Sequence, residues 1–227
     1  MRLLLTFLLF LVPTLGVWTF YTAADHGWWM PPGVSTYAQD IDDLFYLILW
    51  MVAFFFILTE GLLVYFVFKY AKEDDTKAVF SHGNHKLELI WTVIPGILLL
   101  IIAFSQMGTW AKIKYRNNLP QAEPIAHVWA SQFDWQMQYP GADGVFGTWD
   151  DIESPHLFKV PVDEDVVFIL HSRDVLHSFF VPQFRLKQDA VPGMAIPIWF
   201  NSKTEGIYDL ICTELCGWGH YKMAGRV

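Results

Sequence analysis

The sequence has little charge and few cysteines, and each shortage excludes a class of protein. Only 17% of its 227 residues are charged, whereas 54% are hydrophobic, and the mean hydropathy is +0.31. These values exclude a purely soluble protein with a single core. The two cysteines, Cys212 and Cys216, are too few for a disulfide scaffold and too close in sequence to cross-link distant parts of a domain.

Basic residues are also in the minority. The chain has 15 Lys and Arg residues against 23 Asp and Glu residues, which gives a formal net charge of -8 and a pI of about 5.4. A chain with this balance offers no basic surface to phosphate, so we expect no nucleic-acid partner and favour a basic protein partner. The 11 Trp, 9 Tyr and 19 Phe residues supply enough apolar surface to exclude intrinsic disorder.

The sequence does contain long apolar runs, and three of them precede residue 108. A helix needs about 20 apolar residues to cross a hydrocarbon core of roughly 30 Å. The run 44–68 is interrupted by the charge of Glu60 alone, and the run 89–107 contains no charge. We expect these two runs to form a transmembrane helical hairpin over residues 44–108.

The third run covers residues 3–21 and follows Arg2. A basic residue, an apolar stretch and a candidate cleavage site at Ala23-Ala24 also fit a signal peptide. We favour an uncleaved transmembrane helix over residues 1–25, with the cleaved signal peptide as the alternative. Residues 26–43 are then an external loop.

The charges around the runs predict their orientation, because Lys and Arg gather on the cytoplasmic side of a membrane. The loop 22–43 contains four Asp residues and no Lys or Arg, whereas the loop 69–88 contains four Lys residues. Its lysines are Lys69, Lys72, Lys77 and Lys86. The loop 69–88 is therefore expected in the cytoplasm, and everything from about residue 109 is expected on the outer face.

Residues 109–227 have the pattern of an exported all-β domain. They contain short β-like stretches separated by Gly and Pro, which is typical of a sandwich or a barrel. The stretches that we expect to be strands are 127–135, 166–171, 196–200 and 207–211.

Two thiols, an imidazole and a thioether are concentrated within residues 212–223. They belong to Cys212, Cys216, His220 and Met223. Soft ligands of this kind select copper over harder metals. Gly217 and Gly219 disfavour a regular helix, so we expect a loop wrapped around a metal. His177 is the best candidate for a second imidazole, because its apolar flanks would hold it in a packed layer.

Other interpretations of this cluster are open at this point. Two cysteines four residues apart can form a local disulfide, and with histidines they can form a Cys2His2 zinc site. Neither explains why Met223 and the distant His177 accompany the pair. Five further histidines are interpreted as ordinary polar residues, namely His82, His85, His127, His156 and His171.

The pattern Cys-x-Glu-x-Cys-Gly-x-Gly-His-x-x-Met over residues 212–223 resembles subunit II of the haem-copper cytochrome c oxidases of bacteria, which carries a binuclear CuA centre. The resemblance extends from about residue 40 to residue 227. It includes Asp-Val-Leu-His-Ser-Phe at 174–179, Lys-Gln-Asp-Ala-Val-Pro-Gly at 187–193 and Glu-Leu-Ile-Trp-Thr at 88–92. It implies a membrane-anchored all-β fold, in which an N-terminal transmembrane α-helical hairpin precedes a cupredoxin-like Greek-key β-sandwich over residues 109–227.

The resemblance also implies a set of ligands for the two copper ions of CuA. The side-chain ligands would be His177, Cys212, Cys216, His220 and Met223. Glu214 would bind copper through its backbone carbonyl, and its carboxylate would reach a magnesium ion shared with the catalytic subunit.

The implied function is that of cytochrome c oxidase subunit II, an electron relay in a proton-translocating oxidoreductase of the bacterial inner (plasma) membrane. Electrons from cytochrome c, or from a tethered haem c domain beyond Val227, would reach CuA and pass to haem in subunit I, where oxygen is reduced. Subunit III and membrane lipid are further expected partners. No catalytic oxygen site would lie on this chain.

Three further residues receive roles from the resemblance. Glu88 would take up protons at the mouth of a proton channel of the catalytic subunit. Phe133, which stands where the family commonly has Trp, and Trp135 would form the contact that receives electrons. We expect a basic cytochrome to be steered by acidic residues, namely Asp134, Asp150, Asp151 and Glu153.

Related proteins supply the alternatives. A quinol oxidase subunit II shares the hairpin and the sandwich but lacks the copper ligands, and nitrous oxide reductase is soluble and carries a large propeller. The remaining alternative is a membrane-anchored copper carrier or assembly protein. Such proteins usually have simpler Cys and His sites, without Glu214, Met223 and Asp189 in this arrangement.

Overall fold

The computed structural model of the protein describes residues 2–26, 28–71, 77 and 80–227, which form two compact units. The helical unit consists of Met1–Met30 and Asp43–Gln106, and the β unit consists of Pro31–Asp42 and Met107–Val227. Lys72 of the loop 69–88 lies outside the described residues.

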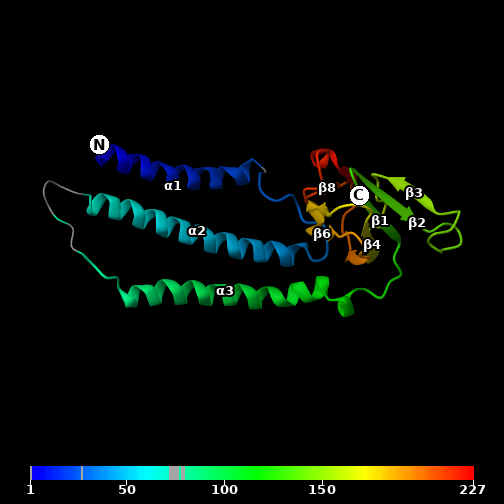
Figure 1. The fold of residues 1–227 in the computed structure, drawn as a ribbon, viewed down its shortest axis with the longest axis horizontal. Coiled ribbons are helices and arrows are strands. Elements are labelled where there is room, and N and C mark those ends of the chain that lie inside the picture. Colours follow the sequence, from blue (N-terminus) through cyan, green and yellow to red (C-terminus); the bar gives the residue numbers. More distant parts are fainter. Residues whose placement is uncertain (1, 27, 72–76, 78–79) are drawn as a thin grey trace. The chain divides into compact units, whose positions relative to one another are not determined.

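Three helices account for the helical unit (Figure 1). They are α1 Arg2–Asp25, α2 Ala38–Lys69 and α3 His85–Lys114. Both α2 and α3 are long and apolar enough to cross a membrane. The N-terminus of α3 is capped by Asn84, whose side-chain oxygen accepts hydrogen bonds from the N–H groups of Lys86 and Leu87.

Helix α1 contacts α2 inside the helical unit. The ring centroids of Phe20 and Trp50 are 5.6 Å apart, and Gly16 faces the ring of Phe56. A cavity of about 650 Å³ is lined by residues of these two helices, which include the carboxyl of Glu60. The acid that interrupts the run 44–68 therefore lies on the side of α2 that faces α1.

The β unit is a sandwich of two sheets (Figure 1). One sheet has the strand order β3-β2-β1-β4-β7, and the other has the order β6-β5-β8-β9. The strands are β1 Ala126–Ser131, β2 Asp134–Tyr139, β3 Ile152–Pro155, β4 Val166–Ser172, β5 His177–Val181, β6 Leu186–Ala190, β7 Ile196–Phe200, β8 Asp209–Cys212 and β9 Ala224–Arg226. Strands β1 and β4 pair in parallel and the other neighbours are antiparallel. The expected membrane-anchored β-sandwich is confirmed.

Alternation of buried and half-buried side chains explains why the sandwich closes. Ala126, Val128 and Ala130 of β1 point into the core, whereas the residues between them lie on the outer face. Aromatic rings from both sheets meet between the layers, as in the 5.1 Å contact between the ring centroids of Phe168 and Phe179. Each fully buried ring of this kind contributes about 1.5–3 kcal/mol relative to its exposed state.

The strand predictions were partly right. Strands β4 and β7 match the stretches 166–171 and 196–200 closely, and β8 begins two residues later than expected. The prediction of one strand over 127–135 was wrong, because a turn at Gln132 and Phe133 divides it into β1 and β2. Neither turn residue is a Gly, Pro, Asn, Asp or Ser, so the usual turn signal is missing there.

A buried ion pair holds the segment Pro31–Asp42 on the sandwich. The Arg185 guanidinium donates from Nε to Asp42 Oδ1 at 2.6 Å and from Nη2 to Asp42 Oδ2 at 3.0 Å. It also donates to the carbonyl of Pro31 at 2.6 Å. Only 7% of the Arg185 side chain and 17% of the Asp42 side chain are exposed, so each charge depends on the other for its stability.

We expect Arg185→Ala to destabilise the β unit by about 3 kcal/mol, because it leaves the Asp42 carboxylate buried without its partner. The thermal midpoint of the detergent-solubilised chain should fall by roughly 10 °C. The matched control is Lys203→Ala, which removes an exposed ion pair with Asp163 and should cost less than about 1 kcal/mol. Equal midpoints for the two variants would contradict the assigned role of the buried pair.

Candidate metal centre

Three connections meet at one end of the sandwich: the β1–β2 turn, the β4–β5 connection and the loop 213–223 between β8 and β9. Phe179 of β5 is paired with Cys212 of β8. Because these strands are antiparallel, the first residue of β5, His177, lies at the same end as the last residue of β8. The sheet register thus brings together residues that are 35 positions apart in sequence.

His177, Cys212 and Cys216 are buried, and their ligand atoms all lie within 4.8 Å of one another. The two Sγ atoms are 3.9 Å apart, and both cysteines are free thiols rather than a disulfide. Cys216 Sγ lies 3.6 Å from His220 Nδ1 and 3.9 Å from Met223 Sδ. All five side chains that the sequence pattern singled out therefore converge on one place.

The backbone carbonyl of Glu214 completes this group. It accepts a hydrogen bond from the Cys212 thiol at 3.3 Å, so its oxygen faces the cluster. The Glu214 side chain is half-buried. The carbonyl and the carboxylate of this residue are thus available for two different contacts.

The orientation of His177 is set by Asp174. The imidazole is completely buried, and its Nε2–H donates to Asp174 Oδ1 at 2.7 Å, which assigns the tautomer. Its other nitrogen, Nδ1, is buried and has no hydrogen-bond partner within the described part of the chain. An unpaired buried acceptor is costly, so this nitrogen fits a metal ligand better than a structural polar atom.

The Cys216 thiol is protonated at neutral pH in the metal-free protein. Burial, together with the adjacent Cys212, raises the pKa of Cys216 to about 11. A metal that binds here must therefore displace a proton from this thiol.

The loop 213–223 is held in place by the β1–β2 turn. The side-chain amide of Gln132 donates to the carbonyl of Cys216, and the backbone N–H of Gln132 donates to Asp174 Oδ2 at 2.7 Å. A Cβ atom on Gly219 would lie 2.4 Å from the ring of Phe133. Glycine is required at this position because the aromatic ring occupies the space of a side chain.

The residues expected to receive electrons occupy two different environments. Phe133 is half-buried in the β1–β2 turn, where its ring touches the loop 213–223. Trp135 is completely buried in β2, with its ring centroid 5.5 Å from that of Phe179 and 6.3 Å from that of His177. The structure thus places Trp135 in the core, next to the candidate ligand His177.

Glu88 lies in the first turn of α3, in the helical unit. Its Oε2 is 3.0 Å from Nδ1 of His85, and both side chains are exposed. His85, which was interpreted as an ordinary polar residue, is thus the partner of the acid expected to take up protons.

The other histidines make ring or polar contacts. The His127 ring stacks on Phe146, and the His171 ring stacks on Trp129. His156 pairs with Asp134 at 3.0 Å, and the His82 ring meets Phe80 edge-on. These contacts agree with their interpretation as residues outside the metal cluster.

Sequence reasoning missed Asp174 and Gln132, which position the ligands without being ligands. The signal for Asp174 was its place three residues before His177, in the connection that precedes β5. No sequence signal pointed to Gln132, because its contact with Cys216 spans 84 positions.

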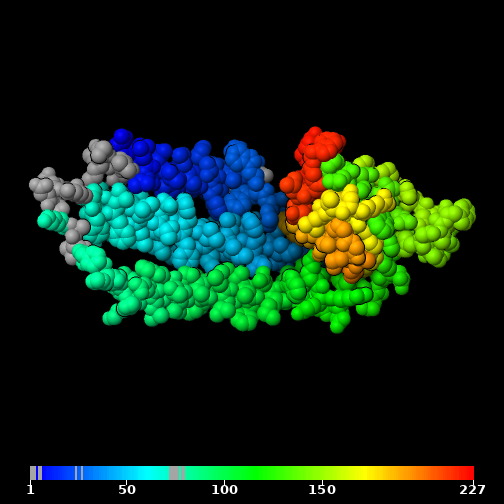
Figure 2. All heavy atoms as spheres, viewed as in Figure 1, coloured from blue at the N-terminus to red at the C-terminus, as the bar shows by residue number. Residues whose placement is uncertain are grey.

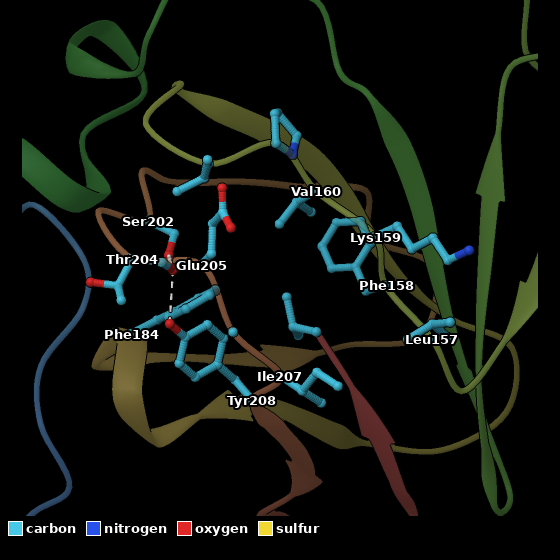
Figure 3. Close-up of a pocket in the computed structure, with 14 residues that line it drawn as sticks. Leu157, Phe158, Lys159, Val160, Phe184, Ser202, Thr204, Glu205, Ile207 and Tyr208 are labelled. Carbon is cyan, nitrogen blue, oxygen red and sulfur yellow. Dashed lines mark hydrogen bonds between the residues drawn. The ribbon is translucent and has the colours of Figure 1, made fainter.

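A hollow of about 500 Å³ in the β unit lies away from this cluster (Figure 3). It is lined mainly by apolar side chains such as Phe158, Phe184 and Tyr208, and the Tyr208 hydroxyl donates to the carbonyl of Thr204. Tyr208 precedes β8 and Cys212 ends it, so the hollow and the cluster lie at opposite ends of that strand. The hollow has no Cys or His in its lining, and it carries none of the ligand chemistry.

Two protein-family models match most of the chain. The transmembrane domain of cytochrome c oxidase subunit II matches residues 23–108, and the periplasmic domain of the same subunit matches residues 127–227. The two matches fall on the helical part and on the β part of the chain, respectively.

Curated relatives are similar along nearly the whole chain. An alternative cytochrome c oxidase subunit 2 from Bradyrhizobium diazoefficiens is 29% identical over 222 residues, which cover 88% of this chain and 79% of the relative. Cytochrome c oxidase subunit 2 of Cereibacter sphaeroides is 30% identical over 223 residues, which cover 85% of this chain and 72% of the relative. Among solved structures, the periplasmic domain of cytochrome oxidase subunit II from Bradyrhizobium japonicum is 26% identical, with a TM-score of 0.40, over 48% of this chain and 84% of that chain.

We expect Asp174→Ala to weaken copper binding by about 10- to 100-fold, because His177 loses the acceptor that fixes its ring and tautomer. Competition with a copper chelator on the purified chain measures this affinity. Asp163→Ala, which removes an exposed carboxylate of the same unit, is the control and should leave the affinity unchanged. A wild-type affinity in Asp174→Ala would show that the carboxylate does not position the ligand.

Proposed function

Because the chain belongs to the cytochrome c oxidase subunit II family, we propose that its cluster around His177, Cys212 and Cys216 is the CuA centre of that family. The protein is a membrane-anchored subunit of an oxidoreductase complex, it functions with other oxidase subunits, and its β domain is extracytoplasmic. The role of the family is to accept electrons at CuA.

The donor set of the cluster fits two copper ions. The ligands that we propose are the side chains of His177, Cys212, Cys216, His220 and Met223 and the backbone carbonyl of Glu214. Thiolate, imidazole and thioether groups are the soft ligands that copper prefers. Cys212 and Cys216 would hold the copper together with the other ligands, and the bound metal would supply a site that gains and loses one electron.

The protein contributes rigidity and the exclusion of water. His177 is fully buried, and Cys212, Cys216 and Met223 are between 2% and 8% exposed. Asp174 and Gln132 hold the imidazole and the loop by hydrogen bonds from two other connections. Ligands that are fixed before the metal binds keep the same arrangement in both oxidation states.

This burial is the observation that favours an electron relay over a copper carrier or assembly protein. A carrier must exchange its metal with a partner, which requires accessible ligands. Here the side chains of His177, Cys212, Cys216 and Met223 are buried, and only that of His220 is half-buried. The zinc alternative leaves the thioether of Met223, which lies 3.9 Å from Cys216 Sγ, without a role.

The finer assignments of cofactors and partners follow from this proposal. The carboxylate of Glu214 binds a magnesium ion shared with the catalytic subunit, a role that fits its half-buried position beside the cluster. The haem groups belong to subunit I, subunit III completes the complex, and cytochrome c or a tethered haem c domain is the donor. The complex lies in the bacterial inner membrane.

The proposed arrangement in the membrane has four parts. Residues 1–25 are an uncleaved transmembrane helix, residues 26–43 an external loop, residues 44–108 the hairpin and residues 109–227 the exported domain. The packing of Pro31–Asp42 onto the β unit supports the external position of the loop, since both must then lie on one side of the membrane.

Electrons are proposed to arrive near Phe133 and Trp135. Phe133 supplies a contact beside the loop 213–223. Trp135 is buried, and its ring packs against that of His177 in the core. The acids proposed for steering are divided between two places. Asp134 begins β2 beside the cluster, but Asp150 and Asp151 directly precede β3, opposite the far end of β2 and roughly 17 Å away along the strand.

We expect the wild-type chain to bind two copper ions and Cys216→Ser to abolish the electron paramagnetic resonance signal of an electron shared by both. The reason is that the substitution removes one of the two thiolates that can bridge the ions. Copper content and the spectrum of the purified chain are the measurements. The metal-free forms of both proteins should have similar thermal midpoints, which controls for folding. One copper per chain, or bound zinc without a purple colour, would overturn the proposal.

We propose that Glu88 takes up protons from the cytoplasm for the catalytic subunit. Its exposed carboxyl at the start of α3 lies next to an ionisable partner, His85. Glu88→Ala should slow reduction of the haem in the assembled oxidase by roughly 100-fold, the scale of a lost acid–base group, with the CuA spectrum unchanged. Stopped-flow spectroscopy measures this, and Glu88→Asp, which keeps a carboxyl, should retain most of the rate. Unchanged haem reduction in Glu88→Ala would reject the role.

A further inference from the structure

We propose that the indole of Trp218 is the surface on which the electron donor places the exposed edge of its haem. The inference rests on the proposed function of the cluster as CuA. Trp218 lies between Gly217 and Gly219, two positions after Cys216 and two before His220. No other aromatic residue in the loop 213–223 has a candidate ligand two positions before it and another two positions after it.

Trp218 is unusual in being both exposed and fixed. It is 78% exposed, although a Trp side chain is one of the largest apolar surfaces a protein can bury. Its ring meets that of Phe133 edge-on, with 5.3 Å between the centroids, and the ammonium of Lys222 lies 4.6 Å from the centre of the indole. These two contacts favour one orientation of the ring and leave most of it exposed.

The indole lies beside a second ring, that of Phe133, at the ligand loop. Phe133 fills the space in front of Gly219 and touches Trp218, so rings from two different connections lie side by side. The C-terminal segment that carries the loop stands at the surface of the β unit (Figure 2). A partner that docks on Trp218 is therefore separated from the ligands Cys216 and His220 by a single glycine on either side.

The partner that fits this surface is a c-type cytochrome whose haem edge emerges from an apolar ring of side chains. Exposed Trp residues in a small apolar patch are frequent centres of protein–protein binding energy. The charge that contacts the indole is the cation Lys222, and the acids Asp150 and Asp151 lie at the far end of β2. The close contact is thus apolar.

In the transfer, one electron leaves the ferrous haem iron, which becomes ferric, and the copper site is reduced by one electron. No bond or proton changes.

A second exposed indole offers a direct comparison. Trp149 is 96% exposed and lies beside Asp150 in the β2–β3 connection. If acids at that end of the sandwich guided the donor to its final position, Trp149 would be the aromatic residue at the contact. The two Trp residues therefore separate two docking positions on the same domain.

The test compares Trp218→Ala, Trp218→Phe and Trp149→Ala in the assembled oxidase. Calorimetric titration with ferric cytochrome c, which transfers no electron to the site, measures binding alone. We expect about a 30-fold loss of affinity for Trp218→Ala, the scale of a central contact residue, and a smaller loss for Trp218→Phe. Trp149→Ala should bind within about twofold of wild type. Repeating the titration after copper removal keeps the result independent of any change at the metal.

The copper spectrum separates failure of this inference from failure of the proposed function. A wild-type oxidase subunit without the shared-electron signal would refute the proposed function, whatever the affinities are. With that signal present, wild-type affinity in Trp218→Ala, in both the copper-loaded and the copper-free complex, would overturn the docking position. A larger loss in Trp149→Ala than in Trp218→Ala would likewise overturn it and place the donor at the β2–β3 connection.

Discussion

The candidate metal centre depends on one carboxylate, that of Asp174, which joins the β4–β5 connection to the β1–β2 turn. It accepts hydrogen bonds from the His177 imidazole, from the backbone N–H of Gln132 and from that of Val175. Burial acts to raise the pKa of Asp174, but these hydrogen bonds outweigh it and hold the pKa below its usual value. The group is therefore an ionised acceptor at neutral pH, and the ligand geometry is set before any metal is present.

The sandwich makes this carboxylate effective by fixing where the connections end. The pairing of Phe179 with Cys212 places the first residue of β5 beside the last residue of β8, and the hydrogen bond from Cys212 N–H to the Met223 carbonyl returns the loop to the same place. Two thiols, two imidazoles and a thioether thus meet through strand register. Their spacing in sequence alone does not place His177 among them.

The parts of the structure that could be predicted are those with a local physical signal. The runs 44–68 and 89–107 are apolar over a membrane thickness, and they form α2 and α3. Cys212 to Met223 combine soft ligands with glycines, and they form a loop. The β1–β2 turn lacks turn residues, and the contacts of Gln132 are made to residues 42 and 84 positions away. Such contacts depend on tertiary packing, which no local pattern encodes.

An electron-accepting site must satisfy two opposed requirements, and the loop 213–223 meets both within a few residues. The ligands must be buried so that water does not reorganise around a changing charge, yet the donor must approach closely. Cys216 is 4% exposed while Trp218, two residues later, is 78% exposed. Glycines on either side of the indole permit this abrupt change, since Gly217 adopts a φ of +135° and Gly219 leaves room for Phe133. The change from core to surface is therefore made by the backbone of the loop, and the exposed ring remains attached to the ligand segment itself.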